Sequence, residues 1–308
     1  MFEARSDWTT SGVAGLSAVV NCAARAVEST RAEPLIDDPL AALFVERVRV
    51  PAVLPTSVRE VERSGAAGAM VASRFGGVRA RVVDDFLLAA NADGISQVVV
   101  FSPGFCTRAY RLGWGAGVDL YEVEQPELLD VKEAVLRESG AVPRARRHGV
   151  RVDPRREEWG SALLGAGFDV SRPVAWVAEG ILLYLSARGE EQLFTSIREL
   201  SAPGSRLVMQ YMPAELIRWF AGNSALTDTS ATLGEDIGSA NWNTEPRLSA
   251  PDRLRREGWE VRIDSTVERA LALGVPIHEE FSDTGNDAGI EFPEVDEPDG
   301  FLFGTSAG

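Results

Sequence analysis

Short apolar runs alternate along this chain with longer stretches in which apolar residues recur every three or four positions. The short runs are rich in β-branched residues and are bounded by turn-forming residues, which is typical of buried parallel strands. Five such runs lie in the middle of the chain, at 97–101, 118–123, 149–153, 174–178 and 205–211. Two further candidate strands, at 259–263 and 301–303, lie near its end.

The stretches between these runs have helical periodicity. Helices are predicted at 11–29, 40–49, 78–91, 126–139, 155–165, 188–201 and 213–221. Pro34 and Pro39 interrupt the helical pattern after the first of these, because a proline disfavours helix in the residue before it. Residues 50–76 mix Pro, Gly and Ala without a period, so we expect a mobile, lid-like insertion there. Residues 222–248 are expected to be rich in loops.

Strands that alternate with crossover helices predict an α/β fold built on a doubly wound parallel sheet. The chain has 308 residues, of which 45% are apolar, so it can bury a sizeable core. No run of about 18 uncharged apolar residues occurs, and no membrane span is expected. The N-terminal residues are polar and include acids, unlike a signal peptide. We therefore expect a cytoplasmic protein.

The formal net charge of −15 argues against a general nucleic-acid binder, because affinity for phosphate backbones depends mostly on Lys and Arg. Residues 279–299 contain nine acids and no basic residue. This segment is interpreted as a solvated loop; the alternative is an acidic lip that repels anions or attracts a basic partner. Two histidines, His148 and His278, leave little material for a metal site, so no metal is expected. The acidity does not exclude a nucleotide-like cofactor that a few placed groups hold.

Candidate chemistry gathers where the predicted strands end. Ligands bind beyond the carboxyl ends of strands in an open parallel sheet. The first strand is followed by Ser102, Pro103 and Gly104, and acids follow the next three strands, at Glu122, Glu124, Asp153 and Glu179. Carboxylates accept hydrogen bonds from ribose hydroxyls, amino groups and ammonium groups. A dinucleotide site would need the pattern G-x-G-x-x-G, but this turn has one glycine. A nucleoside cofactor without phosphates, such as S-adenosyl-L-methionine, is therefore favoured over NAD.

An ordered series of motifs resembles the leucine carboxyl methyltransferase family, in the bacterial branch that includes methyltransferases of small molecules and polyketide acids. The motifs are PLIDDP at 34–39, RARVVDDF at 79–86, GFCTRAYRL at 104–112, EVEQP at 122–126, Asp153, and AEGILLYL at 178–185. The resemblance covers roughly residues 10–212. It implies a class I S-adenosylmethionine-dependent methyltransferase fold, a Rossmann-like doubly wound sheet of seven strands with a helical cap.

On this basis we expect one methyltransferase domain over 1–308. Its parts would be a helical N-terminal cap or lid (1–76), a cofactor-binding core (77–211), and a substrate insertion with the last strands (212–308). The family further implies which residues bind the cofactor: Arg79 its carboxylate, Ser102 and Gly104 its methionine part, Glu124 with neighbouring Glu122 its ribose, Asp153 and Pro154 its adenine, and Glu179 after the fourth strand. Tyr184 lies in the segment that meets the substrate and is the catalytic candidate. Tyr211, Trp219 and Trp242 are expected to bind substrate.

The chain departs from the family in the loop after the first strand. The family's turn usually reads Gly-Leu-Asp-Thr-Arg, whereas residues 104–108 read Gly-Phe-Cys-Thr-Arg. Cys106 thus replaces a charged acceptor, and Pro103 stiffens a loop that normally has small residues. A packed, buried cysteine is the simpler interpretation of Cys106.

Methyl transfer from a sulfonium is an in-line displacement, so positioning is the enzyme's main task. A substrate carboxylate is already ionised at pH 7 and needs no strong base. Together with the resemblance, this favours carboxyl O-methylation, and the resemblance implies a small natural product of secondary metabolism as the substrate. Two alternatives stay open at this point. The scaffold could serve a non-methylating reaction, such as a cyclisation or rearrangement, or it could belong to a non-enzymatic binding protein.

Overall fold

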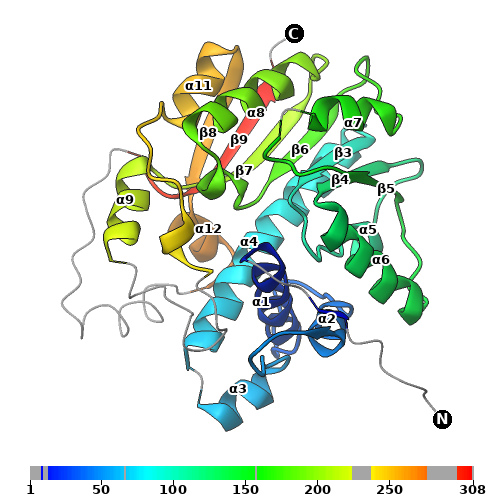
Figure 1. The fold of residues 1–308 in the computed structure, drawn as a ribbon, viewed down its shortest axis with the longest axis vertical. Coiled ribbons are helices and arrows are strands. Elements are labelled where there is room, and N and C mark those ends of the chain that lie inside the picture. The colour runs from blue at the N-terminus through cyan, green and yellow to red at the C-terminus, as the bar shows by residue number, and fades with distance from the viewer. Residues whose placement is uncertain are drawn as a thin grey trace.

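The computed structural model of the chain describes residues 8–9, 13–65, 67–156, 158–223, 237–275 and 297–306 (Figure 1). Its centre is a seven-stranded sheet in the order β5-β4-β3-β6-β7-β9-β8. The strands are β3 (Gln97–Phe101), β4 (Asp119–Glu124), β5 (Arg146–Arg151), β6 (Val174–Ala178), β7 (Arg206–Tyr211), β8 (Trp259–Ser265) and β9 (Gly300–Ser306). Strand β9 runs antiparallel to both of its neighbours, and the other pairings are parallel. This is the topology of class I methyltransferases, as expected.

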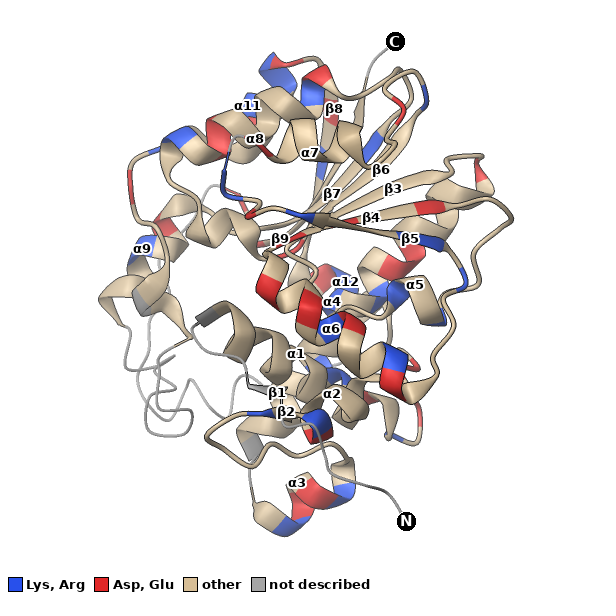
Figure 2. Cartoon of the chain, turned by 45° about the vertical axis from the view of Figure 1, so that its right-hand side comes forward, with Lys and Arg blue, Asp and Glu red and all other residues tan. Residues whose placement is uncertain are grey.

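Helices cover both faces of the sheet. Alternate residues of β3 point to opposite faces: Val98 and Val100 join one apolar cluster, and Val99 and Phe101 join the other. The first cluster packs under α4 (Ala67–Ala92) and α5 (Arg108–Arg111), and the second under α7 (Trp159–Gly165), α8 (Ala187–Glu199) and α11 (Ala250–Arg256). Burial on both faces explains why the central strands β3 and β6 contain no charged residue (Figure 2).

A group of N-terminal helices packs at one end of the sheet, where Figure 1 shows α1 to α3 together. It contains α1 (Val13–Ser29), α2 (Ala41–Arg47), α3 (Val58–Ser64) and the short parallel pair β1 (Trp8–Thr9) and β2 (Val48–Arg49). Helices α1 and α2 share a buried cluster with α6 (Pro126–Ser139). The ring of Phe44 in α2 stacks on Phe105, with centroids 4.7 Å apart. The helical group is thereby fixed to the loop that follows β3.

The prediction of a lid-like insertion at 50–76 is wrong over most of that range. Residues 58–64 form α3, and α4 begins at Ala67, well before the predicted helix at 78–91. The glycines that obscured the helical pattern allow α4 to approach α1 closely. A Cβ on Gly76 would lie 3.3 Å from the Cβ of Ala24, and one on Gly77 would lie 2.6 Å from the Cγ of Glu28.

Other differences are smaller. The helix predicted at 40–49 ends at Arg47, because the next two residues form β2, and the one predicted at 155–165 begins at Trp159. Helix α9 (Ala214–Gly222) agrees within one residue. Helices α11 and α12 (Thr266–Ala272) were not predicted, although each is capped by a serine, Ser249 or Ser265, with an acid three residues later. Two short 3-10 helices, Ile181–Tyr184 (η1) and Ser239–Asn241 (η3), were also not predicted.

Some predictions fall on residues outside the described ranges. They are the loop-rich stretch over 224–236, most of the acidic segment at 279–299, and His278. Among the described residues, no helix combines the length and the apolar character needed to cross a membrane.

Candidate active site

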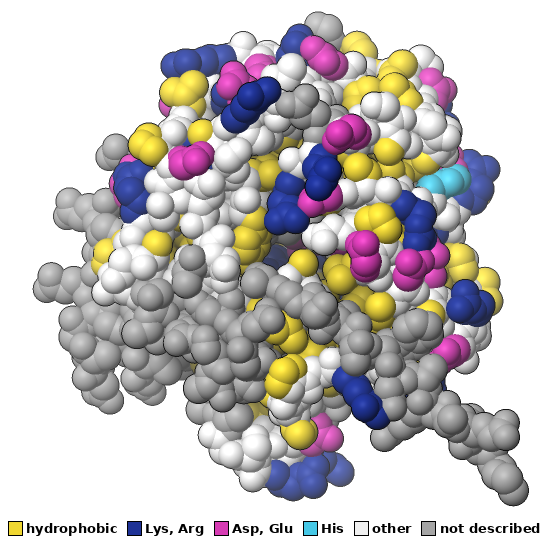
Figure 3. Space-filling view, viewed as in Figure 1, with side chains coloured by type: hydrophobic (Ala, Val, Ile, Leu, Met, Phe, Trp, Pro, Cys, Tyr) yellow, Lys and Arg dark blue, Asp and Glu magenta, His cyan; other side chains and the backbone are white. Residues whose placement is uncertain are grey.

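A cavity of about 700 Å³ opens at the carboxyl ends of β3, β4, β5 and β6. Helices α1 and α4 contribute to its wall, and Phe220 and Trp242 line it as well. It contains nine of the predicted site residues: Arg79, Ser102, Gly104, Glu124, Asp153, Pro154, Glu179, Tyr184 and Trp242. On the outer surface, acidic and basic side chains are interspersed around the hollowed middle of the face shown in Figure 3. The topology thus brings together residues that are far apart in sequence.

The loop after β3 has an unusual backbone. Ser102 has φ 46° and is the one non-glycine residue with positive φ in the described part of the chain. Gly104 has φ 50°, and a Cβ there would lie 3.0 Å from the Cβ of Ala18 in α1. A non-glycine residue with positive φ, such as Ser102, costs free energy in the folded state, and such residues tend to cluster at functional sites.

Helix α1 holds this loop in place through Arg25. Its Nη2 donates to the carbonyl oxygen of Phe105 at 2.9 Å, and its Nε donates to Asp38 Oδ2 at 2.8 Å. The same carboxylate oxygen accepts the hydroxyl of Thr107 at 2.7 Å. The Asp38 side chain is completely buried. The PLIDDP motif therefore supplies a carboxylate that connects α1 to the loop, a role that its sequence pattern did not reveal.

Glu124 is fixed by the two loops that flank it. The N–H of Gly104 donates to its Oε2 at 2.9 Å, and the N–H of Gln125 donates to its Oε1 at 2.8 Å. Burial raises the pKa of this carboxyl group. Because a carboxylate can accept about four hydrogen bonds, two remain available for ligand hydroxyls.

A buried chain of alternating charges connects α4 to the end of β6. Arg108 Nε donates to Asp84 Oδ1 at 2.7 Å, and Arg111 contacts the same carboxylate. The Nη atoms of Arg108 donate to Glu179. Burial acts to raise the pKa of Glu179, but Arg108, together with Arg79 and Arg25, outweighs it, and the pKa is lowered. Glu179 is therefore held ionised beside the cavity.

Arg79 differs from the other arginines of this region in its partners. Its hydrogen bonds go to the neutral side-chain amides of Asn21 and Gln210, and its Nε lies 3.8 Å from Glu179 Oε1. Arg81, two residues further along α4, instead pairs with Asp85 and is 43% exposed. Arg79 is thus the guanidinium most available to a ligand carboxylate.

Asp153 and Pro154 lie at the end of β5, on the cavity wall. The side chain of Arg155 pairs with Asp153 at 2.7 Å. Burial acts to raise the pKa of Asp153, but hydrogen bonds from Arg155 outweigh it, and the pKa is lowered.

Three predicted residues lie elsewhere. Glu122 is 1% exposed, and its two oxygens pair with Lys132 and Arg147. It therefore faces away from the cavity, and the prediction that it lies beside the ribose is wrong. Tyr211 lines a second, smaller cavity. Trp219 lines neither cavity and packs edge-on against Phe220. Phe220, the neighbour of the predicted Trp219, therefore forms part of the wall of the first cavity.

The sequence analysis did not identify several residues that line the first cavity, among them Asn21, Arg25, Gln210 and Phe220. Gln210 follows the apolar core of β7 and carried a positional signal, because it lies at the carboxyl end of a strand. The two α1 residues carried none, since the cap's position over the sheet edge is a property of the tertiary fold.

The residues present fit a nucleoside cofactor with an amino-acid tail. One end of the cavity offers acceptors for hydroxyl and amino groups, in Glu124 and Asp153, and the guanidinium of Arg79 suits a carboxylate. Gly104 lines the cavity, and because it has no side chain its loop can pack against Ala18 of α1. A volume of about 700 Å³ lies within the range of roughly 300–1,000 Å³ that is usual for such sites.

Several known proteins are similar to this chain. The model of the family described as "Leucine carboxyl methyltransferase" matches residues 18–198. A protein of Mycolicibacterium gilvum named "Putative S-adenosyl-L-methionine-dependent methyltransferase" is 39% identical over 298 residues, covering 93% of this chain and 97% of that protein. A protein of Mycolicibacterium smegmatis with the same designation is 36% identical over 285 residues, covering 92% and 95%. A solved structure, a duf574 family protein from Streptomyces avermitilis, has 13% identity and a TM-score of 0.47, covering 96% of this chain and 100% of that one. The chain therefore belongs to the leucine carboxyl methyltransferase family of S-adenosyl-L-methionine-dependent methyltransferases.

Proposed function

We propose that this methyltransferase esterifies a carboxylate of a small-molecule natural product. The carrying observation is that every described acid on the cavity wall already has hydrogen-bond or ion-pair partners within the protein. Asp153 and Glu179 pair with arginines that lower their pKa values, and Glu124 accepts two backbone N–H groups. None of the three is placed as a free base. An acceptor that is already ionised at neutral pH suits such a site.

The cofactor, when bound, supplies a methyl group on a sulfonium. The cofactor contacts we propose are those of Arg79, Ser102, Gly104, Glu124, Asp153, Pro154 and Glu179, all of which line the cavity. The chain's own task is then to orient the acceptor, because distance and angle control an in-line displacement. Tyr184, in η1 at the end of β6, is the proposed contact to the acceptor.

Aromatic side chains form the wall that we assign to the acceptor. Phe220 and Trp242 pack edge-to-face, with ring centroids 5.8 Å apart, and both line the cavity. Apolar and aromatic walls are usual in sites that bind small molecules. The description of the matching family as a carboxyl methyltransferase supports a carboxylate as the acceptor.

The test is methyl transfer from labelled S-adenosyl-L-methionine to matched carboxylic acids, alcohols, phenols and amines. We expect base-labile methyl esters of the acids, at a rate that hardly changes between about pH 6 and 9, because carboxyl pKa values lie near 4. Calorimetry should show binding of S-adenosylhomocysteine and none of NAD. Labelling of phenols or amines alone, with a rate that rises steeply with pH, would rule out carboxyl methylation.

A further inference from the structure

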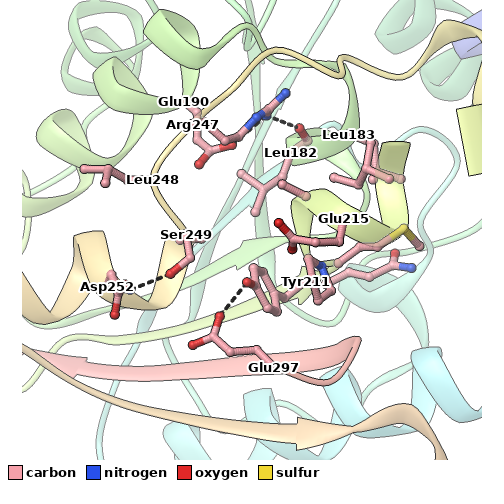
Figure 4. Close-up of a pocket in the computed structure, with 16 residues that line it drawn as sticks. Leu182, Leu183, Glu190, Tyr211, Glu215, Arg247, Leu248, Ser249, Asp252 and Glu297 are labelled. Carbon is pink, nitrogen blue, oxygen red and sulfur yellow. Dashed lines mark hydrogen bonds and ion pairs between the residues drawn. The ribbon is translucent and has the colours of Figure 1, made fainter. Parts of the chain in front are cut away.

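A second cavity, of about 350 Å³, lies beside the first (Figure 4). We call it the side cavity; it lies between η1, α8, β7, α9 and the start of α11. Leu183, Gln210 and Met212 line both cavities. Gln210 also contacts Arg79 in the first cavity. An acceptor with its reacting end in the first cavity and its remote end in the side cavity would pass these shared residues.

More acidic than basic residues line the side cavity. Its lining contains four acids, Glu190, Glu215, Asp252 and Glu297, and one base, Arg247. Arg218 and Arg255 pair with some of these acids from outside the lining, and both are about half exposed. Glu215 and Asp252, the acids of two of these pairs, are themselves more than half exposed, whereas Glu297 is 27% exposed and Glu190 is buried. The buried part of the negative charge therefore lies at Glu190 and Glu297.

The guanidinium of Arg247 has no donor left for a ligand. Nη1 donates to Glu190 Oε2 at 2.8 Å and to the carbonyl of Leu182 at 3.3 Å. Nη2 donates to the carbonyl and the side-chain oxygen of Asn243, at 2.7 and 3.0 Å, and Nε donates to the carbonyl of Glu245 at 3.4 Å. These contacts use all five N–H groups of the arginine. Arg247 therefore attaches the 243–247 segment to η1 and does not serve as an anion site.

Acceptor capacity, in contrast, remains. Glu190 is 5% exposed, and its Oε1 has no hydrogen-bond partner among the described residues, while its Oε2 is taken by Arg247. The carboxylate of Glu215 lies between Leu182 and Tyr211 in Figure 4. Burial raises the pKa of Glu190, and Arg247 and Arg253 do not fully compensate for it. A ligand that enters here must bring donors and positive charge.

We propose that the side cavity binds an ammonium group at the remote end of the acceptor. Leu182, Leu183 and Ile217 provide apolar walls for the carbon chain between the two ends. The acceptor would then be an amino acid in which several carbons separate the amine from the reacting carboxylate. This last step rests on the proposed carboxyl methylation, whereas the ammonium site itself does not.

The first experiment measures binding without cofactor and without turnover. Calorimetry compares n-hexylammonium with 1-hexanol and hexanoate, which have the same chain length. We expect the ammonium to bind at least about tenfold more tightly than the alcohol, and hexanoate to bind most weakly. Equal affinity of ammonium and alcohol, or tighter binding of hexanoate, would overturn the proposal.

Variants locate the binding. Glu215→Gln and Glu190→Gln should each weaken n-hexylammonium binding by about threefold to tenfold and leave 1-hexanol unchanged. Glu191→Gln is the matched control, because that side chain follows Glu190 in α8 but is 59% exposed and pairs with Arg253 outside the cavity. Glu190→Gln removes a partner of Arg247, so its melting temperature is measured, and Glu215→Gln decides the outcome if that variant unfolds. Ammonium affinity that is unchanged in Glu215→Gln would overturn the proposal.

A final comparison separates this inference from the proposed function. With labelled cofactor, 6-aminohexanoate should be methylated with a KM at least about tenfold lower than that of hexanoate. Methylation of hexanoate as efficient as that of 6-aminohexanoate would keep carboxyl methylation and overturn the side cavity's role. Ammonium binding that Glu215→Gln weakens, without any ester from either acid, would support the ammonium site and contradict carboxyl methylation.

Discussion

Lys132, the only lysine of the chain, is completely buried, and its Nζ lies 2.6 Å from Glu122 Oε1. The pair joins α6 to β4, and Arg147 of β5 donates to the other oxygen of Glu122 at 2.7 Å. Burial acts to raise the pKa of Glu122, but Lys132 and then Arg147 outweigh it, and the pKa is lowered. Glu122 therefore lies in the interior of the protein and is not available to a ligand.

Lys132→Met should destabilise the protein by about 3 kcal/mol, because removing one partner leaves a buried charge with incomplete compensation. The double variant Lys132→Met with Glu122→Gln should recover part of this loss. Urea unfolding of the wild type, both single variants and the double variant measures the coupling. If the losses of the two single variants simply add in the double variant, the pair has no coupling energy and this interpretation is wrong.

The same pair predicts a dependence of stability on pH. A carboxyl group with a lowered folded-state pKa stabilises the fold above its unfolded pKa, and that stability is lost as the pH falls through the folded value. The wild type should therefore lose stability below about pH 4.5, and the double variant should lose less over the same interval. Unfolding free energies from pH 7 to pH 3 measure this, and parallel curves would assign the acid sensitivity to other groups.

The sequence predicted the central sheet well because its strands are buried on both faces. Such strands appear as uninterrupted apolar runs, and the bounds of β3 and β6 agree residue for residue. The start of α4 was not predicted, because the sequence there does not favour a helix. Gly76 and Gly77 have low intrinsic helix propensity, and the helix forms there because they let α1 approach.

The candidate site was predictable where position along a strand determines position in space. Glu124 is the last residue of β4, Glu179 directly follows β6, and Asp153 lies two residues beyond β5; all three line the cavity. Glu122 has the same residue type two positions earlier on β4, but the partner that buries it comes from α6, ten residues later. Which of two neighbouring acids faces a ligand thus depended on a tertiary contact that spacing does not encode.

Arg79→Ala should weaken binding of S-adenosylhomocysteine about 10-fold to 100-fold, which corresponds to the roughly 1.5–3 kcal/mol of a charge-assisted hydrogen bond. Arg81→Ala is the matched control, because Arg81 lies on another face of α4, pairs with Asp85 and does not line the cavity. Calorimetry with both variants decides. Equal losses at the two positions would show that a different residue binds the cofactor's carboxylate.

Cys106→Asp should be tolerated, with a melting temperature within a few degrees of the wild type and a Kd for S-adenosylhomocysteine within about threefold. Cys106 lies on the cavity wall, and its Sγ is 3.8 Å from Arg108 Nη1. A carboxylate at this position would therefore meet a guanidinium and would not be buried without a cation.

Cys106→Leu is the control for this prediction, since it enlarges the side chain without adding charge. It should lower cofactor affinity more than the aspartate does. If Cys106→Asp loses both stability and affinity, the loop has been reshaped around its cysteine and no longer accommodates the acid usual in the family.

Gly104→Ala tests the close approach between the loop after β3 and α1. The substituted residue would keep φ near 50°, a conformation that costs a residue with a Cβ about 1–2 kcal/mol. Its methyl group would also press on the Cβ of Ala18, 3.0 Å away. Because the N–H of Gly104 donates to Glu124, displacement of the loop should weaken S-adenosylhomocysteine binding as well as stability.

Two further variants separate the steric part of this effect from the backbone part. Ala18→Gly combined with Gly104→Ala removes the clash and keeps the unfavourable φ, so it should restore part of the cofactor affinity. Gly113→Ala is the control for glycine replacement as such, since Gly113 has no positive φ and a Cβ there would meet nothing within 4 Å. Calorimetry and thermal unfolding should therefore rank Gly113→Ala nearest to the wild type and Gly104→Ala furthest from it. If Ala18→Gly rescues nothing, the loss lies wholly in the backbone conformation, and contact with α1 does not determine the shape of the loop.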